Sequence, residues 1–380
     1  MGKEKTDPFR TAVIFYSFIL TVLVIWIHAV DPGKGVSGIP AFTGGAGPFL
    51  QELLGSCLGQ IAVPGFFCLS AYLFFRNAEH LDAAFYRNKW RSRIRTLVIP
   101  YLLWNLIYYL IYLAAGKTVF SIPVLLDALL FHRYHPVFWY LKELILLTAA
   151  APLTGLLVKY KKAALPMLIL SFLGAVFYER LPVHLINEDA FFYYMTGAAL
   201  ALHAGRTEAD PDAQRKFLPA ALLLFVFCET VALFFPTLPS NVLFFVIGAR
   251  LSGLLAVYSL SVLCISGRAK DLPGFMKDNF FVYAVHYLEI RLFQMAAGLV
   301  FGEPLSDGTF AALYLVMPLL CIAVSAFTAK QMRRRCPALY SLLTGGRHIR
   351  HLKAALGTVG IVKIQGDGHG CGTGRKTPVK

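Results

Sequence analysis

The sequence has few charged residues. Asp, Glu, Lys and Arg make up 15% of its 380 residues, whereas a soluble domain carries about 25%. Hydrophobic residues make up 57% and are gathered in long runs between short polar stretches. A soluble protein of this length would not have enough polar residues to shield so many apolar segments from water. The composition therefore excludes a soluble globular protein and predicts an integral membrane protein.

Acidic residues and paired cysteines are also scarce. The chain has 21 Asp and Glu against 36 Lys and Arg, which gives a net charge of +15. In a soluble protein this charge would suggest a nucleic-acid partner, but here we expect none, because membrane topology accounts for it. Most of the 7 cysteines lie in or beside apolar runs and no pair has metal-ligand spacing. We therefore expect small apolar fillers and no metal site.

The apolar runs predict an all-α, polytopic membrane helix bundle with about ten transmembrane helices. A bilayer core needs about 20 apolar residues per helix, and the backbone inside lipid must satisfy its own hydrogen bonds. The first run lacks a small-residue cleavage site, so we expect a membrane span and not a signal peptide. The predicted spans are residues 11–30, 57–75, 96–115, 136–158, 163–178, 190–204, 217–235, 242–265, 279–301 and 309–329.

Basic residues alternate between the two sides of these spans. One set of connections holds most of the Lys and Arg, including those of residues 76–95 and everything from Lys330 onward. The other set holds four: Lys34, Lys117, Arg133 and Arg180. Positive residues stay on the cytoplasmic side of a membrane. The pattern therefore predicts that both chain ends are cytoplasmic and that the number of spans is even.

Two segments outside the spans have their own character. Residues 116–135 carry apolar side chains at helical spacing, which predicts a short amphipathic helix at the outer interface. We expect residues 1–340 to form the transmembrane domain and residues 341–380, which are rich in glycine and basic residues, to form a flexible cytoplasmic tail. His348, His351, His369 and Cys371 in this tail could be metal ligands, but a solvated tail on anionic lipid is the favoured interpretation.

Ionisable residues inside spans are candidates for function, because lipid excludes them. His28 ends the first span, and His286, Glu289 and Arg291 share the ninth. A histidine can take a proton from a hydroxyl near neutral pH. The alternatives are a headgroup-level position for His28 and a structural ion pair between helices for the others.

Further polar residues gather toward the outer leaflet and in one cytoplasmic loop. Lys142 and Glu143 follow Trp139 and Tyr140 at the start of the fourth span. Glu229 and Arg250 lie in the outer halves of the seventh and eighth spans, which predicts a polar cavity open to the outside. In the loop, the basic residues Lys89, Arg91, Arg93 and Arg95 suit the phosphates of a nucleotide-like donor, or serve as ordinary positive-inside anchors.

Six segments, in chain order, resemble the membrane acyltransferase-3 family of bacteria, and most of all its surface-polysaccharide O-acyltransferases. The resemblance covers about residues 8–347. The segments are IWIHA, AVPGFFCLSAYLFFRN, RIRTLVIPYLLWN, FWYLKELI, NFFVYAVHYLEI and LLTGGR.

The resemblance implies transfer of an acyl group, usually acetyl, from cytoplasmic acyl-CoA to a hydroxyl of a cell-surface glycan or lipid-linked sugar. It implies a multi-pass protein of the bacterial plasma membrane, with acyl-CoA as a substrate and no bound cofactor. By motif, His28 is the catalytic histidine, and Arg93 and Arg95 touch the donor. Other motif positions have less defined roles: Ser70, Pro100, Tyr101, Trp104, Asn105, Trp139 and His286.

Two positions depart from the family pattern. Many members carry an arginine eleven residues before the first-span histidine, where this chain has Ser17. Arg250 or Arg291 could replace it from another helix. Ala71 stands where the family usually has glycine.

The expected mechanism uses His28 as general base, oriented by Glu143 or Glu289. Arg250, Arg291 or Lys142 would stabilise the oxyanion, and His286 completes the catalytic set. Trp139, Tyr140 and Asn105 are further candidates for substrate binding, and Arg91 joins Arg93 and Arg95 at the donor. Two alternatives remain open: a transporter or flippase for a glycan or small molecule, and an inactive sensor module on the same fold.

Overall fold

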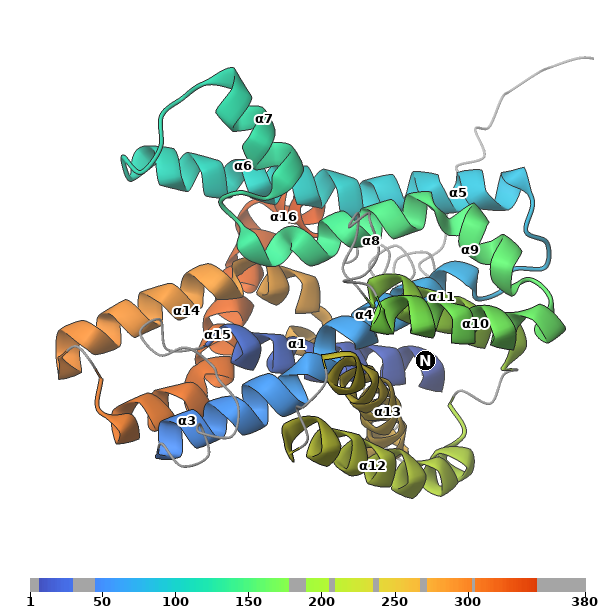
Figure 1. The fold of residues 1–380 in the computed structure, drawn as a ribbon. Coiled ribbons are helices and arrows are strands. Elements are labelled where there is room, and N and C mark those ends of the chain that lie inside the picture. Colours follow the sequence, from blue (N-terminus) through green and yellow to red (C-terminus); the bar gives the residue numbers. More distant parts are fainter. Residues whose placement is uncertain are drawn as a thin grey trace, which may run out of the picture.

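The computed structural model describes residues 7–29, 45–177, 189–204, 209–234, 239–266, 272–302 and 305–346. All regular structure in this part of the chain is helical (Figure 1). The prediction of an all-α fold is therefore confirmed. The predicted flexible tail lies almost entirely outside the described residues, and so do its histidines and Cys371.

Among the described residues, six helical segments are long and apolar enough to cross a membrane: Pro8–His28, Ala46–Phe75, Ala83–Ala114, Pro211–Phe234, Leu243–Ile265 and Asp307–Arg335. The helices α8 (Trp139–Ala149) and α9 (Ala151–Val158), together with the short η4 (Pro136–Phe138) before them, make a seventh if the bent pair is one span. Three more predicted spans correspond to α10 (Lys161–Val176), α11 (Ala190–His203) and α14 (Asn279–Phe301). A multi-helix membrane protein is confirmed, and the count of ten stays a prediction.

The remaining bounds complete the bundle. They are α1 (Pro8–His28), α3 (Ala46–Leu50), α4 (Ala62–Phe75), α5 (Ala83–Arg93), α6 (Ile99–Ala114), α7 (Ile122–Phe131), α12 (Pro211–Phe234), α13 (Pro239–Ile265), α15 (Asp307–Arg335) and α16 (Pro337–Leu343). Short 3-10 segments also occur at η2 (Gly59–Ile61), η4 (Pro136–Phe138) and η6 (Gly274–Lys277). Helix α1 packs against α4, α13, α14 and α15, and so lies at the centre of the bundle (Figure 1).

Two of the long segments change their winding part-way. A π-helix, η1 (Gln51–Leu58), follows α3, and another, η3 (Ile94–Val98), joins α5 to α6. Pro100 has no backbone N–H for the carbonyl of Thr96, so the helix there loses a regular hydrogen bond. Figure 1 shows α5 and α6 continuing one another across this joint. Such π segments occur often at functional sites.

The short helix predicted within residues 116–135 is confirmed as α7 (Ile122–Phe131). Its N-cap is Ser121, whose hydroxyl accepts a hydrogen bond from the Val124 N–H at 3.3 Å. Ile122 and Leu126 are exposed. Together with Figure 1, where α7 projects from the rest of the bundle, this exposure agrees with a helix lying at an interface.

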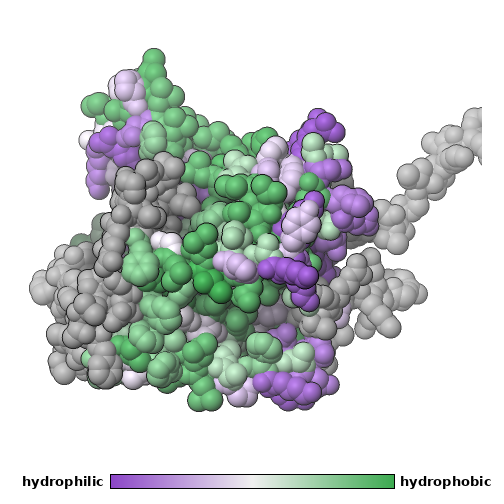
Figure 2. Space-filling model, turned by 45° about the vertical axis from the view of Figure 1, so that its right-hand side comes forward, coloured by the Kyte–Doolittle hydropathy of each residue, from purple (hydrophilic) through white to green (hydrophobic). Residues whose placement is uncertain are grey.

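The surface has the belt that lipid requires. Figure 2 shows hydrophobic residues across the middle of the visible face and hydrophilic residues gathered toward its edges. Exposed apolar side chains occur on helices that lie far apart in the sequence, for example Leu170, Leu223 and Leu299. An aqueous surface would not tolerate this arrangement, whereas a bilayer does.

Candidate active site

The structure brings the two predicted catalytic histidines together. Helix α1 ends at His28, and the backbone N–H of the next residue, Ala29, bonds back to the Ile25 carbonyl at 2.9 Å. The half-buried His28 ring lies beside α14, with its centroid 5.4 Å from that of His286 and 6.1 Å from that of Tyr287. The site therefore forms where the first and ninth predicted spans meet.

His286 has a defined tautomer. Its ring is 0% exposed, and Nδ1 lies 2.7 Å from the Tyr283 carbonyl oxygen. A carbonyl only accepts hydrogen bonds, so Nδ1 carries the proton and Nε2 keeps its lone pair. Nε2 has no hydrogen-bond partner among the described residues. A buried acceptor is thus held close to the His28 ring.

Arg291 reaches the same end of α1. Its guanidinium lies over the Tyr287 ring at 5.2 Å and donates a 3.1 Å hydrogen bond to Gln294. The Gln294 amide in turn donates to the Ala29 carbonyl at 3.3 Å. Arg291 therefore places a positive charge beside the histidine pair, from a helix other than the one that carries Ser17.

Arg250, the other arginine expected to replace the family residue, is engaged elsewhere. It forms an ion pair with Asp189 at 2.5 Å and donates to Gln60 at 3.2 Å. These contacts tie α13 to the start of α11 and to η2. Of the two candidates, Arg291 is the one that the structure places next to the His28 and His286 rings.

The predicted carboxylates occupy different parts of the bundle. Both oxygens of Glu289 accept from the Ser325 hydroxyl at 3.0 Å, which links α14 to α15. Glu143 is buried in α8, beside the half-buried Lys142. Their role in orienting His28 stays a prediction.

Aromatic side chains at the start of α8 contact α4 and α14. The Tyr140 ring lies 4.8 Å from Phe67 of α4 and 6.0 Å from Tyr283 of α14. Trp139, next to Tyr140, is half-buried. Asn105 is buried in α6, where its amide donates to the Tyr101 carbonyl at 3.0 Å. Tyr140, next to Trp139, therefore links α8 to both α4 and α14, and Asn105 lies within α6.

Sequence reasoning missed another buried histidine. His135, at the start of η4, is 0% exposed and its Nε2 lies 3.0 Å from the Ala284 carbonyl. The Tyr108 hydroxyl donates to the same carbonyl at 3.2 Å. The sequence placed His135 in an outer connection, and its only signal was its place directly before Pro136 and the FWY motif. Burial lowers the pKa of nearby His132, and the Lys142 ammonium lowers it further.

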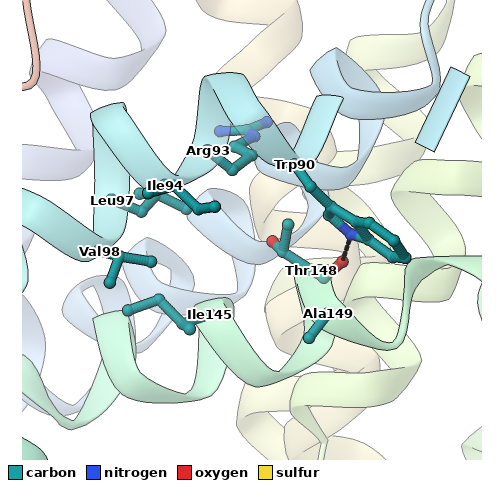
Figure 3. Close-up of a pocket in the computed structure, with 8 residues that line it drawn as sticks. All are labelled: Trp90, Arg93, Ile94, Leu97, Val98, Ile145, Thr148 and Ala149. Atoms are coloured by element: carbon teal, nitrogen blue, oxygen red, sulfur yellow. Dashed lines mark hydrogen bonds between the residues drawn. The ribbon is translucent and has the colours of Figure 1, made fainter. Parts of the chain in front are cut away.

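Arg93, one of the predicted donor-binding arginines, lines a groove (Figure 3). Its volume is about 340 Å³, and it opens between the α5–η3 segment and α8. The indole N–H of Trp90 donates to the Thr148 carbonyl at 2.8 Å and closes one end. The lining residues are Trp90, Arg93, Ile94, Leu97, Val98, Ile145, Thr148 and Ala149.

The three arginines differ in their surroundings. Arg93 donates to the Ser70 carbonyl at 3.0 Å, and its guanidinium lies 5.9 Å from the Phe74 ring centroid. This contact joins two of the sequence motifs, one on α4 and one on α5. Arg91 and Arg95 are exposed on the same helical segment. They are one helical turn apart on the segment that lines the groove, although neither is one of its lining residues.

This fold and site define a multi-helix membrane enzyme with a histidine pair inside the bundle. Comparison with known proteins gives the class: residues 18–329 match the acyltransferase-3 family, described as an acyltransferase domain. The chain belongs to this family and is an acyltransferase.

One relative gives a further similarity. The chain is 24% identical over 327 residues to the "Succinoglycan biosynthesis protein ExoH" of Rhizobium meliloti (strain 1021), an alignment that covers 79% of this chain and 82% of that protein. No solved structure matches the chain.

Proposed function

We propose that this protein transfers an acyl group, with acetyl as the first candidate, from cytoplasmic acyl-CoA to a hydroxyl of a cell-surface polysaccharide or lipid-linked sugar. It would do so in the bacterial plasma membrane. The observation that carries the proposal is the His28–His286 pair, 5.4 Å apart in a chain of the acyltransferase-3 family. The printed name of the relative, a succinoglycan biosynthesis protein, supports a polysaccharide acceptor.

The chemistry requires a base and a stabilised oxyanion. The sugar hydroxyl attacks the thioester carbonyl, the C–S bond breaks, and the hydroxyl proton passes to the base and then to the leaving thiolate, which becomes the free thiol. A positioned base contributes roughly a hundredfold to ten-thousandfold in rate. His28 is the proposed base, and the Nε2 lone pair of His286 can accept a hydrogen bond from its ring. Arg291, which lies over Tyr287 and is linked through Gln294 to Ala29, supplies a cation for the developing negative charge.

The groove of Figure 3 suits the donor's pantetheine arm. Its lining is almost entirely apolar, whereas the exposed Arg91 and Arg95 beside it suit the donor's phosphates. The opposite wall is α8, whose first turn carries Tyr140. Thr148 and Tyr140 are eight residues apart on α8, which is about 12 Å along a helix at about 1.5 Å per residue.

This arrangement supports a donor arm that runs along α8 toward α14. Tyr140 lies 6.0 Å from Tyr283, whose carbonyl holds His286. An arm lying in the groove would therefore bring the thioester toward the histidines without a covalent acyl-enzyme intermediate. We accordingly propose direct transfer from the thioester to the sugar.

The proposal is tested with the full chain reconstituted in lipid nanodiscs. Acetyl-CoA and a purified bacterial exopolysaccharide are the substrates, and both thiol release and the mass gained by the glycan are measured. The wild type should release thiol and acetylate the glycan in equal amounts. His28→Ala should abolish both while its level in the membrane stays unchanged. Persistent activity in His28→Ala would show that the base assignment is wrong.

A second measurement tests the donor site. Arg91→Ala combined with Arg95→Ala should raise the KM for acetyl-CoA about tenfold or more, because a hydrogen bond to a charged group contributes about 1.5–3 kcal/mol. Arg87→Ala is the matched control, since Arg87 is exposed on the same helix and lies one turn farther from the groove, whose lining begins at Trp90. Equal effects of Arg87→Ala and of the double variant would place the donor elsewhere.

A further inference from the structure

Three contacts join η4 and its N-cap residue His135 to one turn of α14. His135 Nε2 lies 3.0 Å from the Ala284 carbonyl, and the Tyr283 hydroxyl donates to the Val137 carbonyl at 2.5 Å. The rings of Phe138 and Tyr283 are parallel, with an interplanar angle of 2° and centroids 5.7 Å apart. All three contacts fall on Tyr283 and Ala284, three and two residues before His286.

The buried imidazole of His135 has one ring nitrogen whose burial lowers the stability of the folded protein. It is stacked between Tyr108, at 3.8 Å, and Phe138, at 3.7 Å, and it is 0% exposed. Because the Ala284 carbonyl can only accept, Nε2 carries the proton and Nδ1 keeps a lone pair. Nδ1 has no hydrogen-bond partner in the part of the chain that the structure describes. A buried polar atom without a partner costs about 1–3 kcal/mol, so packing alone would favour phenylalanine here.

The turn that His135 contacts also controls His286. The Tyr283 carbonyl holds His286 Nδ1 at 2.7 Å, and the next carbonyl, that of Ala284, accepts from both His135 and Tyr108. Two side-chain donors on one carbonyl, from η4 and from α6, fix the peptide group of this turn. The position of the neighbouring Tyr283 carbonyl follows, and with it the direction of the His286 ring.

We propose that His135 is a positioning residue of the active centre. By donating to the Ala284 carbonyl it holds the turn in which Tyr283 binds His286 Nδ1, so that His286 keeps its Nε2 lone pair for His28. This role rests on the proposed function for its effect on acyl transfer. The proposal also predicts that His286 keeps its proton on Nδ1, and this tautomer can be measured without any substrate.

Two substitutions separate the hydrogen bond from the packing. His135→Gln keeps an N–H donor close to the place of Nε2, whereas His135→Phe keeps the stacked ring and loses the donor. In acetyl transfer, His135→Gln should stay within about threefold of wild type. His135→Phe should lose about tenfold in kcat, which corresponds to about 1.4 kcal/mol, with an unchanged KM for acetyl-CoA. Tyr108→Phe removes the second donor and should give a smaller loss of kcat.

The tautomer is read by ¹⁵N NMR of the full chain in nanodiscs, with histidine labelled and His286→Asn used for assignment. Wild type and His135→Gln should show Nδ1 of His286 protonated, and His135→Phe should show a mixture of tautomers. An unchanged His286 signal in a folded His135→Phe protein overturns the proposal. Equal losses of melting temperature in both variants, with equal losses of kcat, also overturn it, because His135 would then only support the fold.

The two levels of failure are distinct. A wild-type protein that transfers no acetyl group, but whose His286 tautomer responds to His135→Phe, refutes the proposed function and leaves the positioning role standing. An active wild type with wild-type kcat and tautomer in His135→Phe refutes the positioning role alone.

Discussion

The His28 and His286 ring centroids lie 5.4 Å apart, although the two residues are 258 positions apart in the sequence. One ends α1 and the other is in the second turn of α14. Their proximity follows from the packing of α1 against α14 at the centre of the bundle. In the proposed mechanism the two rings act as one unit, and this has a measurable consequence.

The effects on kcat of substituting the two histidines should be non-additive. His286→Asn keeps a donor for the Tyr283 carbonyl near the place of Nδ1 and removes the Nε2 lone pair, so kcat should fall roughly tenfold to a hundredfold. Adding His286→Asn to His28→Ala should cause no further loss, because residues that act as a unit lose their effect together. Steady-state kinetics on both single variants and the double variant measure this. Losses that multiply would mean that the two rings act independently.

Arg291 should matter for catalysis through its planar fork. Arg291→Lys keeps the charge but loses the stacking on Tyr287 and the geometry of the Gln294 bond, so kcat should fall about tenfold. Arg250→Lys is the matched comparison, because Arg250 pairs with Asp189. Arg250→Lys should lower the melting temperature strongly and kcat only weakly. The reverse pattern would assign the oxyanion contact to Arg250.

The Arg250–Asp189 pair should behave as a buried ion pair. The two side chains are 18% and 7% exposed. Asp189→Ala should cost about 3–5 kcal/mol in unfolding free energy, because it leaves a buried charge without its partner, and Arg250→Leu with Asp189→Leu should recover most of the loss. Denaturant unfolding in mixed micelles measures both.

The exposed pair Arg133–Asp127 serves as the control for that experiment. Its side chains are 59% and 38% exposed, so Asp127→Ala should cost about 0–1 kcal/mol. Similar costs for Asp189→Ala and Asp127→Ala would show that the Arg250 charge is well solvated in the folded protein.

The contact between α4 and α11 should depend on Gly197. A Cβ atom there would lie 2.0 Å from the Cys68 carbonyl oxygen, which leaves no room for any side chain. Small residues let membrane helices approach this closely. Gly197→Ala should destabilise the protein by about 1–3 kcal/mol or more.

Gly174→Ala is the matched control for that substitution. Gly174 lies in α10, and a Cβ there would meet nothing within 4 Å. The variant should be unchanged or more stable by up to about 1 kcal/mol, since alanine favours a helix. The melting temperatures of the two variants measure the difference, and equal values would mean that the α4–α11 contact adjusts freely.

The sequence by itself determined the class of fold, because hydrophobicity and helical period are local properties of the chain. Long apolar runs predicted the spanning helices, and the spacing of Ile122 and Leu126 predicted α7. His28 and His286 stood out because ionisable groups are rare inside spans. The order of the motifs indicated the acyltransferase-3 family, to which the chain belongs.

Only the tertiary structure decided which of these residues meet. It placed Arg291 beside the histidines and Arg250 against Asp189, and it fastened His135 to the turn before His286. It also bent the predicted fourth span by 62° between α8 and α9. The physical reason is that a contact between distant segments depends on how each helix is rotated and crossed against its neighbours. In an apolar helix that rotation is set by packing around the whole bundle, which hydropathy along one segment does not encode.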